Sequence, residues 1–204
     1  SKSKKNTIDP QEIIDNYGAD AVRLFILSDS PPDKDIQWSE RGMEAAYRFI
    51  QKLWSLHCKI IEQNFNKDIK DESDTNINIF TNSIIEKITK NLENFNYNVI
   101  IANLYEIYNY FNQQLNLNLD KDNLISNYTK ILKIISPVVP HFSYECLEQL
   151  NIEGKFTWPE VNKKFILSQE YTIVIQINGK KRDLINTKKE MDQSEVLEKI
   201  NQTE

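Results

Sequence analysis

Hydrophobic residues recur along most of the chain at steps of three and four, the spacing of helices that bury one face. The clearest stretch follows Ser39, a residue type that suits an N-cap, and predicts a helix over about residues 39–62. Three more stretches predict helices over about 77–93, 97–115 and 121–135, and together these helices predict a bundle. The expected inward positions are Met43, Ala46, Ile50, Leu53, His57 and Ile60, then Phe80, Ile84, Ile88 and Leu92, then Ile100, Leu104, Ile107 and Phe111, then Leu124, Tyr128, Ile131 and Ile135.

A short helical pattern comes first in the chain. Asp9 suits its N-cap, Pro10 its first position and Glu12 a capping box, while Gly18 supplies its end. A second short helix follows and should end at Ser30-Pro31-Pro32. Its residues available for burial are Val22, Leu24, Phe25 and Ile26.

Two other segments interrupt or follow the long helices. Residues 64–76 are polar and predict a loop. Pro137 and Pro140 should end the last long helix, and a short helix then carries Phe142, Tyr144 and Leu147.

The period changes from helical to alternating after Gly154. In "YTIVIQINGKKRDLINT" the side chains of Tyr171, Ile173, Ile175 and Ile177 alternate with polar or smaller ones, and Asn178-Gly179 suits a two-residue turn. A last helix should begin at Asp192 and Glu195. The predicted fold class is therefore mainly α, a helical bundle followed by a β-hairpin and a helix from a small α+β domain.

Charge is distributed unevenly over the 204 residues. The formal net charge is −5, which disfavours a protein covered by nucleic acid. Lysines nevertheless crowd the start, at Lys2, Lys4 and Lys5, and cations recur at residues 180–182 and 188–189. Two basic ends on an acidic body favour local phosphate contacts.

Other classes of protein and site are disfavoured. No apolar run approaches the roughly 18 residues of a membrane span, so we expect no membrane association. Cys58 and Cys146 are far apart in helical patterns, which favours reduced thiols in the cytoplasm. The pairs His57-Cys58 and His141/Cys146 lack the spacing of a zinc site, and we expect no metal site here.

The start of the chain carries a recognisable motif. Ser1-Lys2-Ser3, with "KKN..DP..II..YGAD..RLF" after it, looks like the KMSKS signature of class I aminoacyl-tRNA synthetases and its downstream helices, without the leading Lys and Met, and Lys4-Lys5-Asn6 is closest to the leucine-specific members. "SDSPPDKDIQWSERGMEAAYRFIQKLW" is similar to the passage into the bundle of these enzymes. "SPVVPHFSYECLEQL", "WPEVN" and "IVIQINGKKRDLI" resemble the late bundle and the start of the C-terminal domain in bacterial members.

This resemblance implies a domain organisation. Residues 1–38 would end the catalytic domain, 39–160 would form the anticodon-binding-like bundle, and 165–204 would begin an incomplete C-terminal tRNA-binding domain. The chain would be a C-terminal fragment that begins inside the KMSKS signature and does not catalyse alone. The full-length enzyme would be a cytoplasmic monomer that joins leucine to tRNA.

The resemblance also implies roles for individual residues. In these enzymes leucine reacts with ATP to give leucyl-adenylate, with Mg²⁺ and a lysine of the signature stabilising the departing pyrophosphate. Lys2 matches that catalytic lysine, and Ser1, Lys2 and Ser3 would bind ATP. Lys4 and Lys5 are equally compatible with a phosphate contact and with a solvated loop.

Candidate tRNA contacts come from two further places. The cluster Lys180-Lys181-Arg182 follows the expected turn, and the family places this small domain at the outer corner of tRNA. On the longest helix Arg41, Arg48 and Lys52 face outward and could meet phosphate, although a solvated face explains them as well. We expect the aromatic residues of the bundle to pack in or near the core rather than to stack on bases, among them Trp38, Trp54, Tyr105 and Tyr108.

Two alternative functions compete with the leucine-specific reading. One is a valine- or isoleucine-specific synthetase, which charging assays with each tRNA would separate. The other is a stand-alone, non-catalytic tRNA-binding module that shares the bundle and the hairpin.

Overall fold

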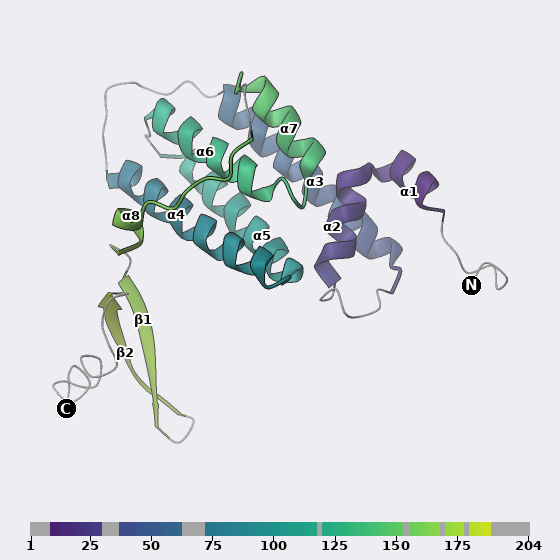
Figure 1. Ribbon diagram of the computed structural model, residues 1–204. Coiled ribbons are helices and arrows are strands. Elements are labelled where there is room, and N and C mark those ends of the chain that lie inside the picture. Colours follow the sequence, from purple (N-terminus) through teal and green to yellow (C-terminus); the bar gives the residue numbers. More distant parts are fainter. Residues whose placement is uncertain are drawn as a thin grey trace.

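The computed structural model describes residues 9–29, 37–62, 72–117, 120–152, 156–167, 170–177 and 180–188. These residues form eight helices and a two-stranded sheet. In chain order the elements are α1 (Pro10–Tyr17), α2 (Ala19–Asp29), α3 (Glu40–Glu62), α4 (Glu72–Glu93), α5 (Tyr97–Gln114), α6 (Lys121–Ile135), α7 (Pro140–Gln149), α8 (Lys163–Leu167), β1 (Glu170–Ile177) and β2 (Lys180–Lys188). Helices α3 to α7 form the bundle, with α1 and the hairpin at opposite ends (Figure 1).

One continuous core holds the bundle and α2 together. Buried side chains of α3 to α7 meet those of α2, including Leu24 and Phe25. The inward positions predicted for 97–115 and 121–135 are all buried. The prediction of a mainly helical bundle is thus confirmed, and its basis is the three-and-four spacing of apolar residues.

Local sequence signals account for several helix ends. The Asp9 side chain accepts a hydrogen bond from the Gln11 amide (2.9 Å) at the start of α1. Ser39 Oγ accepts from the Gly42 amide (3.1 Å) at the start of α3, and Asp120 from the Asn123 amide (2.8 Å) at the start of α6. Gly18, with φ of 82°, separates α1 from α2, a backbone conformation that favours glycine. These caps satisfy amides that have no partner within the helix.

Some predicted positions are wrong. Ile26, expected to be available for burial, is 45% exposed because it lies on the outer face of α2. Ile50 is only half-buried, while Phe49 and Leu56 join the buried stripe of α3. The predicted loop over 64–76 is also too long.

Helix α4 already begins at Glu72. The residues of its first turn are polar, so the apolar period by which the sequence predicts a helix starts only at Ile77. The end of α2 predicted at 30–32, the turn at 178–179 and the helix from Asp192 lie outside the described residues.

Strands β1 and β2 pair antiparallel, with Glu170 opposite Lys188 and Ile177 opposite Lys180. The register shifts between Ile175 and Gln176, which leaves Arg182 as the additional residue of β2. Among the described elements, the extensive contacts of each strand are with the other strand. The hairpin leads away from α8 and from the bundle (Figure 1).

Candidate nucleotide and nucleic-acid interface

The predicted ATP-binding residues Ser1, Lys2 and Ser3, like Lys4 and Lys5, precede the described residues. Helices α1 and α2 follow that segment directly in the chain. What the structure shows next to this predicted site is how α2 is attached to the bundle.

Asp20 fixes α2 to the start of α7. Its side chain is 6% exposed, and its two oxygens accept from the amides of His141 (3.3 Å) and Phe142 (2.6 Å). These amides lie in the first turn of α7, which has no acceptor for them within the helix. A carboxylate at this end also meets the positive end of the helix dipole. Asp20 is therefore an N-terminal cap supplied by a distant segment.

Arg23, one turn further along α2, binds the other side of the same corner. Its Nε donates to the carbonyl of Val138 (3.1 Å) and its Nη2 to that of Pro137 (2.5 Å). These carbonyls lie in the turn between α6 and α7. Asp20 thus binds the amides of the α6–α7 corner, and Arg23 binds its carbonyls. We call these two residues, together with the corner that they bind, the joint.

Close packing completes the joint at α3. A Cβ on Gly42 would lie 2.8 Å from Phe25 Cε2, closer than such contacts occur. The Phe25 ring also packs edge-on against Trp38, with centroids 5.3 Å apart. Helix α3 therefore approaches α2 as closely as it does because residue 42 has no side chain.

An open cleft of about 630 Å³ lies beside the joint, between α2, α3 and α7. Its walls are mainly apolar, with Ile50, Trp54 and Phe142 among them. Glu145 and His141 supply its polar edge.

The candidate cations of the bundle lie on the outer face of α3. Arg41, Arg48 and Lys52 are all exposed, as predicted for an outward face. Arg48 is paired with Glu44, one turn earlier, at 3.3 Å. An exposed pair of this kind is weak, so the Arg48 guanidinium can exchange this partner for another anion.

The hairpin cations lie elsewhere. Lys180, Lys181 and Arg182 are the first residues of β2, and the Lys181 side chain is exposed. The structure therefore does not bring them together with Arg48, because α3 and β2 make no extensive contact in the described part of the chain.

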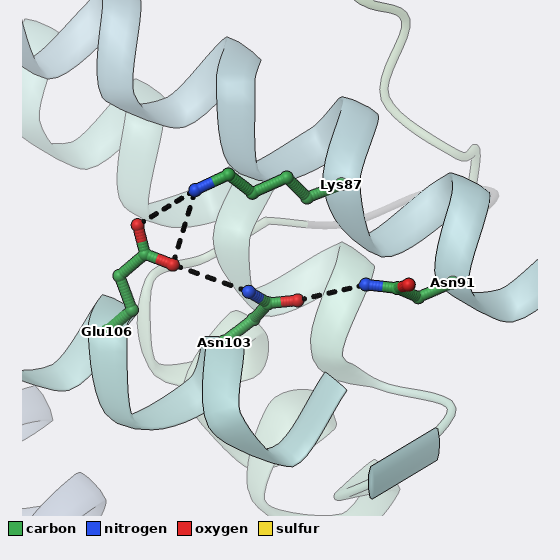
Figure 2. A network of polar contacts seen from close by, with 4 residues as sticks. All are labelled: Lys87, Asn91, Asn103 and Glu106. Atoms are coloured by element: carbon green, nitrogen blue, oxygen red, sulfur yellow. Dashed lines mark hydrogen bonds and ion pairs between the residues drawn. The ribbon is translucent and has the colours of Figure 1, made fainter. Parts of the chain in front are cut away.

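A polar network ties α4 to α5 (Figure 2). Lys87 Nζ contacts both oxygens of Glu106, at 3.0 and 3.4 Å. Asn103 Nδ2 donates to Glu106 Oε2 (3.3 Å), and Asn91 Nδ2 donates to Asn103 Oδ1 (3.2 Å). Lys87 is therefore engaged within the protein, and the sequence did not single out any of the four residues.

The titratable groups inside the bundle are shifted towards their neutral forms. His57 is fully buried, and burial lowers its pKa against weaker opposing effects of Gln149 and Glu145. Burial raises the pKa of the Cys146 thiol to about 12 and that of Tyr128 well above its usual value. Such groups are structural, since a reactive thiol or a catalytic base needs a pKa nearer to neutrality.

Metal and membrane sites can be examined only over the described residues. These contain no group of three or more His, Cys, Asp or Glu side chains arranged to hold a metal ion. None of the described helices is both long and apolar enough to cross a membrane.

Two family models match the chain. Residues 74–198 match the anticodon-binding domain of tRNA ligase, and residues 1–39 match the class I tRNA synthetases for I, L, M and V. The first match covers more than half of the chain. The chain belongs to the anticodon-binding-domain family of tRNA ligases.

Curated members of this group with similar sequences are leucine–tRNA ligases. That of Petrotoga mobilis is 35% identical over 96% of this chain and 25% of its own length. That of Fusobacterium nucleatum is 37% identical over 95% of this chain and 24% of its own length. The chain thus spans about a quarter of the curated relatives it matches.

A solved structure supports the fold. In the ternary complex of Agrobacterium radiobacter K84 agnB2 LeuRS with tRNA and LeuAMS, the protein matches 98% of this chain with a TM-score of 0.76. The match covers 27% of that protein's chain at 22% sequence identity, so it shows the arrangement of the elements.

The aromatic residues of the bundle surface pack near the core, as predicted. Trp38, Trp54 and Tyr105 are exposed at 36–44%, and Tyr108 is half-buried. Each still packs against a buried ring, most closely Tyr105, which stacks on Phe49 with centroids 3.9 Å apart. They are near-core residues whose outer face is open to solvent.

The sequence did not predict the roles of Asp20 and Arg23 in this family member. Both stand in the "YGAD..RLF" stretch, and their spacing of three residues places them on one face of α2. Their partners, however, lie between 114 and 122 residues away in sequence. The spacing was the available signal, and the partner could come only from the fold.

Proposed function

We propose that this chain is the part of a leucine–tRNA ligase that carries the KMSKS lysine and the tRNA-binding bundle. The observation behind the proposal is identity of 35–37% to leucine–tRNA ligases over 95–96% of the chain. The whole enzyme would activate leucine with ATP and Mg²⁺ and transfer it to tRNA in the cytoplasm. The domain limits 1–38, 39–160 and 165–204 belong to the same proposal.

Lys2 is the proposed catalytic residue of this segment. When the leucine carboxylate attacks the α-phosphorus, negative charge grows on the departing pyrophosphate. An ammonium group beside that charge stabilises the transition state more than the ground state. Ser1 and Ser3 would shape the loop and donate hydrogen bonds to ATP.

The joint supports this role. Helices α1 and α2 continue directly from the proposed ATP-binding segment, and Asp20 and Arg23 fix α2 to the α6–α7 corner. A loop that must deliver one charge to a phosphate benefits from a rigid base, because small displacements lose much of the effect.

The first experiment measures leucine-dependent exchange of pyrophosphate into ATP, in the complete ligase. Lys2→Ala should slow exchange by about 10²–10³-fold, as expected for loss of one transition-state contact. Binding of tRNA should stay within about twofold, since this contact is to ATP. Lys59→Ala is the matched control, because it removes the same charge from an exposed position in the last turn of α3, which is not a candidate ATP contact. Unchanged exchange in Lys2→Ala would contradict the proposed role.

The second experiment tests the proposed tRNA contacts. Replacing Lys180, Lys181 and Arg182 by Ala removes up to three phosphate contacts, so the salt dependence of tRNA affinity should become shallower by about one to three in log–log slope. Arg48→Ala should change the slope by at most about one. An identical slope in the triple variant would remove the hairpin from the tRNA interface.

The amino-acid specificity is tested by charging. The proposal expects tRNA charged with leucine, and not with valine or isoleucine. Charging with either of the other two would favour the related synthetases, and a protein that binds tRNA without any exchange activity would favour the binding module.

A further inference from the structure

Another open cleft lies at the end of the bundle where α3 ends, between the side of α6 and the end of α7 (Figure 1). Its volume is about 740 Å³. Lys121, Lys130 and Lys133 line it, whereas Asp122 is the one carboxylate among its described lining residues. The described walls of the cleft therefore carry a net positive charge, on a chain whose formal net charge is −5.

Lys130 and Lys133 have no anionic partner in the described part of the chain. Both side chains are half-buried, and their spacing of three residues places them on one face of α6. The ion pairs seen among the described residues lie elsewhere, on α3 and between α4 and α5. Two like charges at this spacing repel each other, so an anion bound beside them would stabilise this face.

The end of α7 does not supply the missing partner. A lysine beside the C-terminal end of a helix can bind the carbonyl groups left open there. Three of the last carbonyls of α7, however, already accept from the amides of residues 150–152. Asn151, with a φ of 56°, adopts the left-handed conformation that turns the chain back onto this end. These hydrogen bonds satisfy the end of α7 without the lysines.

Hydroxyl groups lie between Lys121 and Lys130 along α6. Ser126 and Thr129 both line the cleft. Thr129 Oγ1 is buried and has no hydrogen-bond partner among the described residues. A buried hydroxyl group without a partner costs free energy, and a ligand with acceptor oxygens would receive its hydrogen bond. Serine and threonine, together with lysine, are residue types that contact phosphate in nucleic-acid complexes.

The row of cations is longer than one phosphate group. Lys121 and Lys133 are twelve residues apart, which is about 18 Å along α6. A single small anion can meet the cations at one end of this row only. A nucleic-acid strand repeats its phosphates along the backbone, so it can meet the cations at both ends.

We propose that this cleft, which we call the lysine cleft, binds the phosphate backbone of RNA. Lys130 and Lys133 would make the main contacts, with Lys121 at the far end and the Thr129 hydroxyl as a hydrogen-bond donor. The inference rests on the proposed function, since that function supplies tRNA as the RNA. It adds a third surface to the candidate contacts on α3 and β2, one that the sequence did not single out.

The experiment measures the tRNA affinity of the complete ligase over a range of salt concentrations. The double variant Lys130→Gln with Lys133→Gln keeps long polar side chains and removes both charges. It should weaken tRNA binding about tenfold at about 0.15 M ionic strength and make the log–log salt dependence shallower by about one to two. Leucine-dependent pyrophosphate exchange, measured without tRNA, should be unchanged. Equal affinity and equal slope in the parent and the double variant would overturn the inference.

Lys90→Gln is the matched control for the single variant Lys130→Gln. Lys90 is exposed in the last turn of α4 and does not line the lysine cleft. We expect Lys130→Gln to weaken tRNA binding about threefold and Lys90→Gln to change it by less than about twofold. The same loss in both would overturn the inference, because the net charge of the protein would then explain the effect.

Two further measurements separate binding from folding. The double variant should unfold at the temperature of the parent or slightly above it, because it removes two charges that repel each other. Bound tRNA should slow the chemical acetylation of Lys130 and Lys133, and leave that of Lys90 unchanged. Acetylation of Lys130 and Lys133 at the same rate with and without tRNA would overturn the inference.

Inorganic phosphate tests whether the lysine cleft binds a small anion instead. If phosphate raised the melting temperature of the parent but not of the double variant, and both bound tRNA equally, the inference would be overturned in favour of a small-ion site. A complete ligase that charges tRNA with leucine, yet binds it equally well with and without the two lysines, would overturn this inference alone. A complete ligase that charges no tRNA with leucine would instead contradict the proposed function.

Discussion

The two ends of the bundle are attached by different chemistry. At the joint, a buried carboxylate and a guanidinium bind the amides and carbonyls of the α6–α7 corner. At the other end, residues 156–162 lead to the start of α8, and we call them the strap. There the side chains of Asn82 and Thr89 on α4 accept hydrogen bonds from the Asn162 amide (2.7 Å) and the Trp158 indole (2.9 Å). The joint lies against the core through Leu24 and Phe25, whereas the hairpin beyond the strap leads away from the bundle (Figure 1).

Because the chemistry differs, mutations at the two ends should have different effects. Charge-assisted bonds are about twice as strong as neutral ones, and removing one partner at the joint leaves buried polar groups unpaired. The neutral hydrogen bonds at the strap contribute less free energy. They still fix where the strap lies along α4, because each of its two donors has one acceptor there. We therefore expect changes at the joint to lower global stability, and changes at the strap to act mainly on α8, which packs on α4.

The largest effect is expected from Asp20→Ala. Two amides in the first turn of α7 lose their acceptor, which should lower the free energy of unfolding by about 2–4 kcal/mol. Urea denaturation measures the change. Asp15→Ala is the control, since Asp15 is exposed and bonds to Gln11 of its own helix, and it should cost less than about 0.5 kcal/mol. Similar values for the two variants would mean that Asp20 is not a stabilising cap.

The next effect comes from pH, at His57 between α3 and α7. Because burial lowers the pKa of His57 in the folded state, the unfolded chain takes up this proton first as the pH falls. Stability from this group is complete above about pH 6.5 and declines below it, by at most about 1.4 kcal/mol per pH unit.

The measurement is urea denaturation at several pH values between 7.5 and 5.5. His57→Gln should remove this part of the pH dependence, while His141→Gln, at an exposed position, should retain it. Equal pH dependence in the parent protein and in His57→Gln would show that the pKa of His57 is the same in the folded and the unfolded chain.

A third test concerns the close approach at the joint. Gly42→Ala normally stabilises a helix by up to about 1 kcal/mol, but here the new Cβ would press on the Phe25 ring. We expect a net loss of about 1 kcal/mol instead. In a Phe25→Leu background the same change should become neutral or stabilising. Thermal unfolding of the parent, the two single variants and the double variant gives the double-mutant cycle that measures this coupling. A stabilising Gly42→Ala in the parent would show that the ring moves aside at little cost.

The smallest global effect is expected from Trp158→Phe at the strap. Loss of the bond to Thr89 should cost about 0.5–1 kcal/mol. Hydrogen exchange should quicken in α8 and leave the protection of α7 unchanged, which would contrast with Asp20→Ala. Uniform quickening over the whole bundle would remove the proposed difference between the two ends.

The comparison also shows how far the sequence predicts this structure. The helices at 97–115 and 121–135 were predicted within about one residue, because apolar spacing and caps such as Asp120 are local. The first turn of α4 was missed because its residues are polar, and the outward Ile26 was misplaced because an apolar residue type does not identify its face.

The residues of the candidate site likewise fall into two groups, those that the sequence identifies and those that only the fold reveals. The KMSKS-like start and the cations at 180–182 were recognised from short runs of sequence, and their roles stay predictions. The importance of Asp20, Arg23, Asn82 and Thr89 could not be predicted, since each acts on a partner far along the chain.

The sequence by itself determined that the segments of α1 to α7 become helices, where most of these helices begin, and which segment alternates as a strand; it did not predict the five-residue α8. These properties depend on residues within a few positions of each other, so they can be read from local spacing. Only the tertiary structure decided which helix ends lie together and which side chains of α4 bind the strap. A buried polar group must find a partner in space, and the chain brings together partners that sequence separation alone does not reveal.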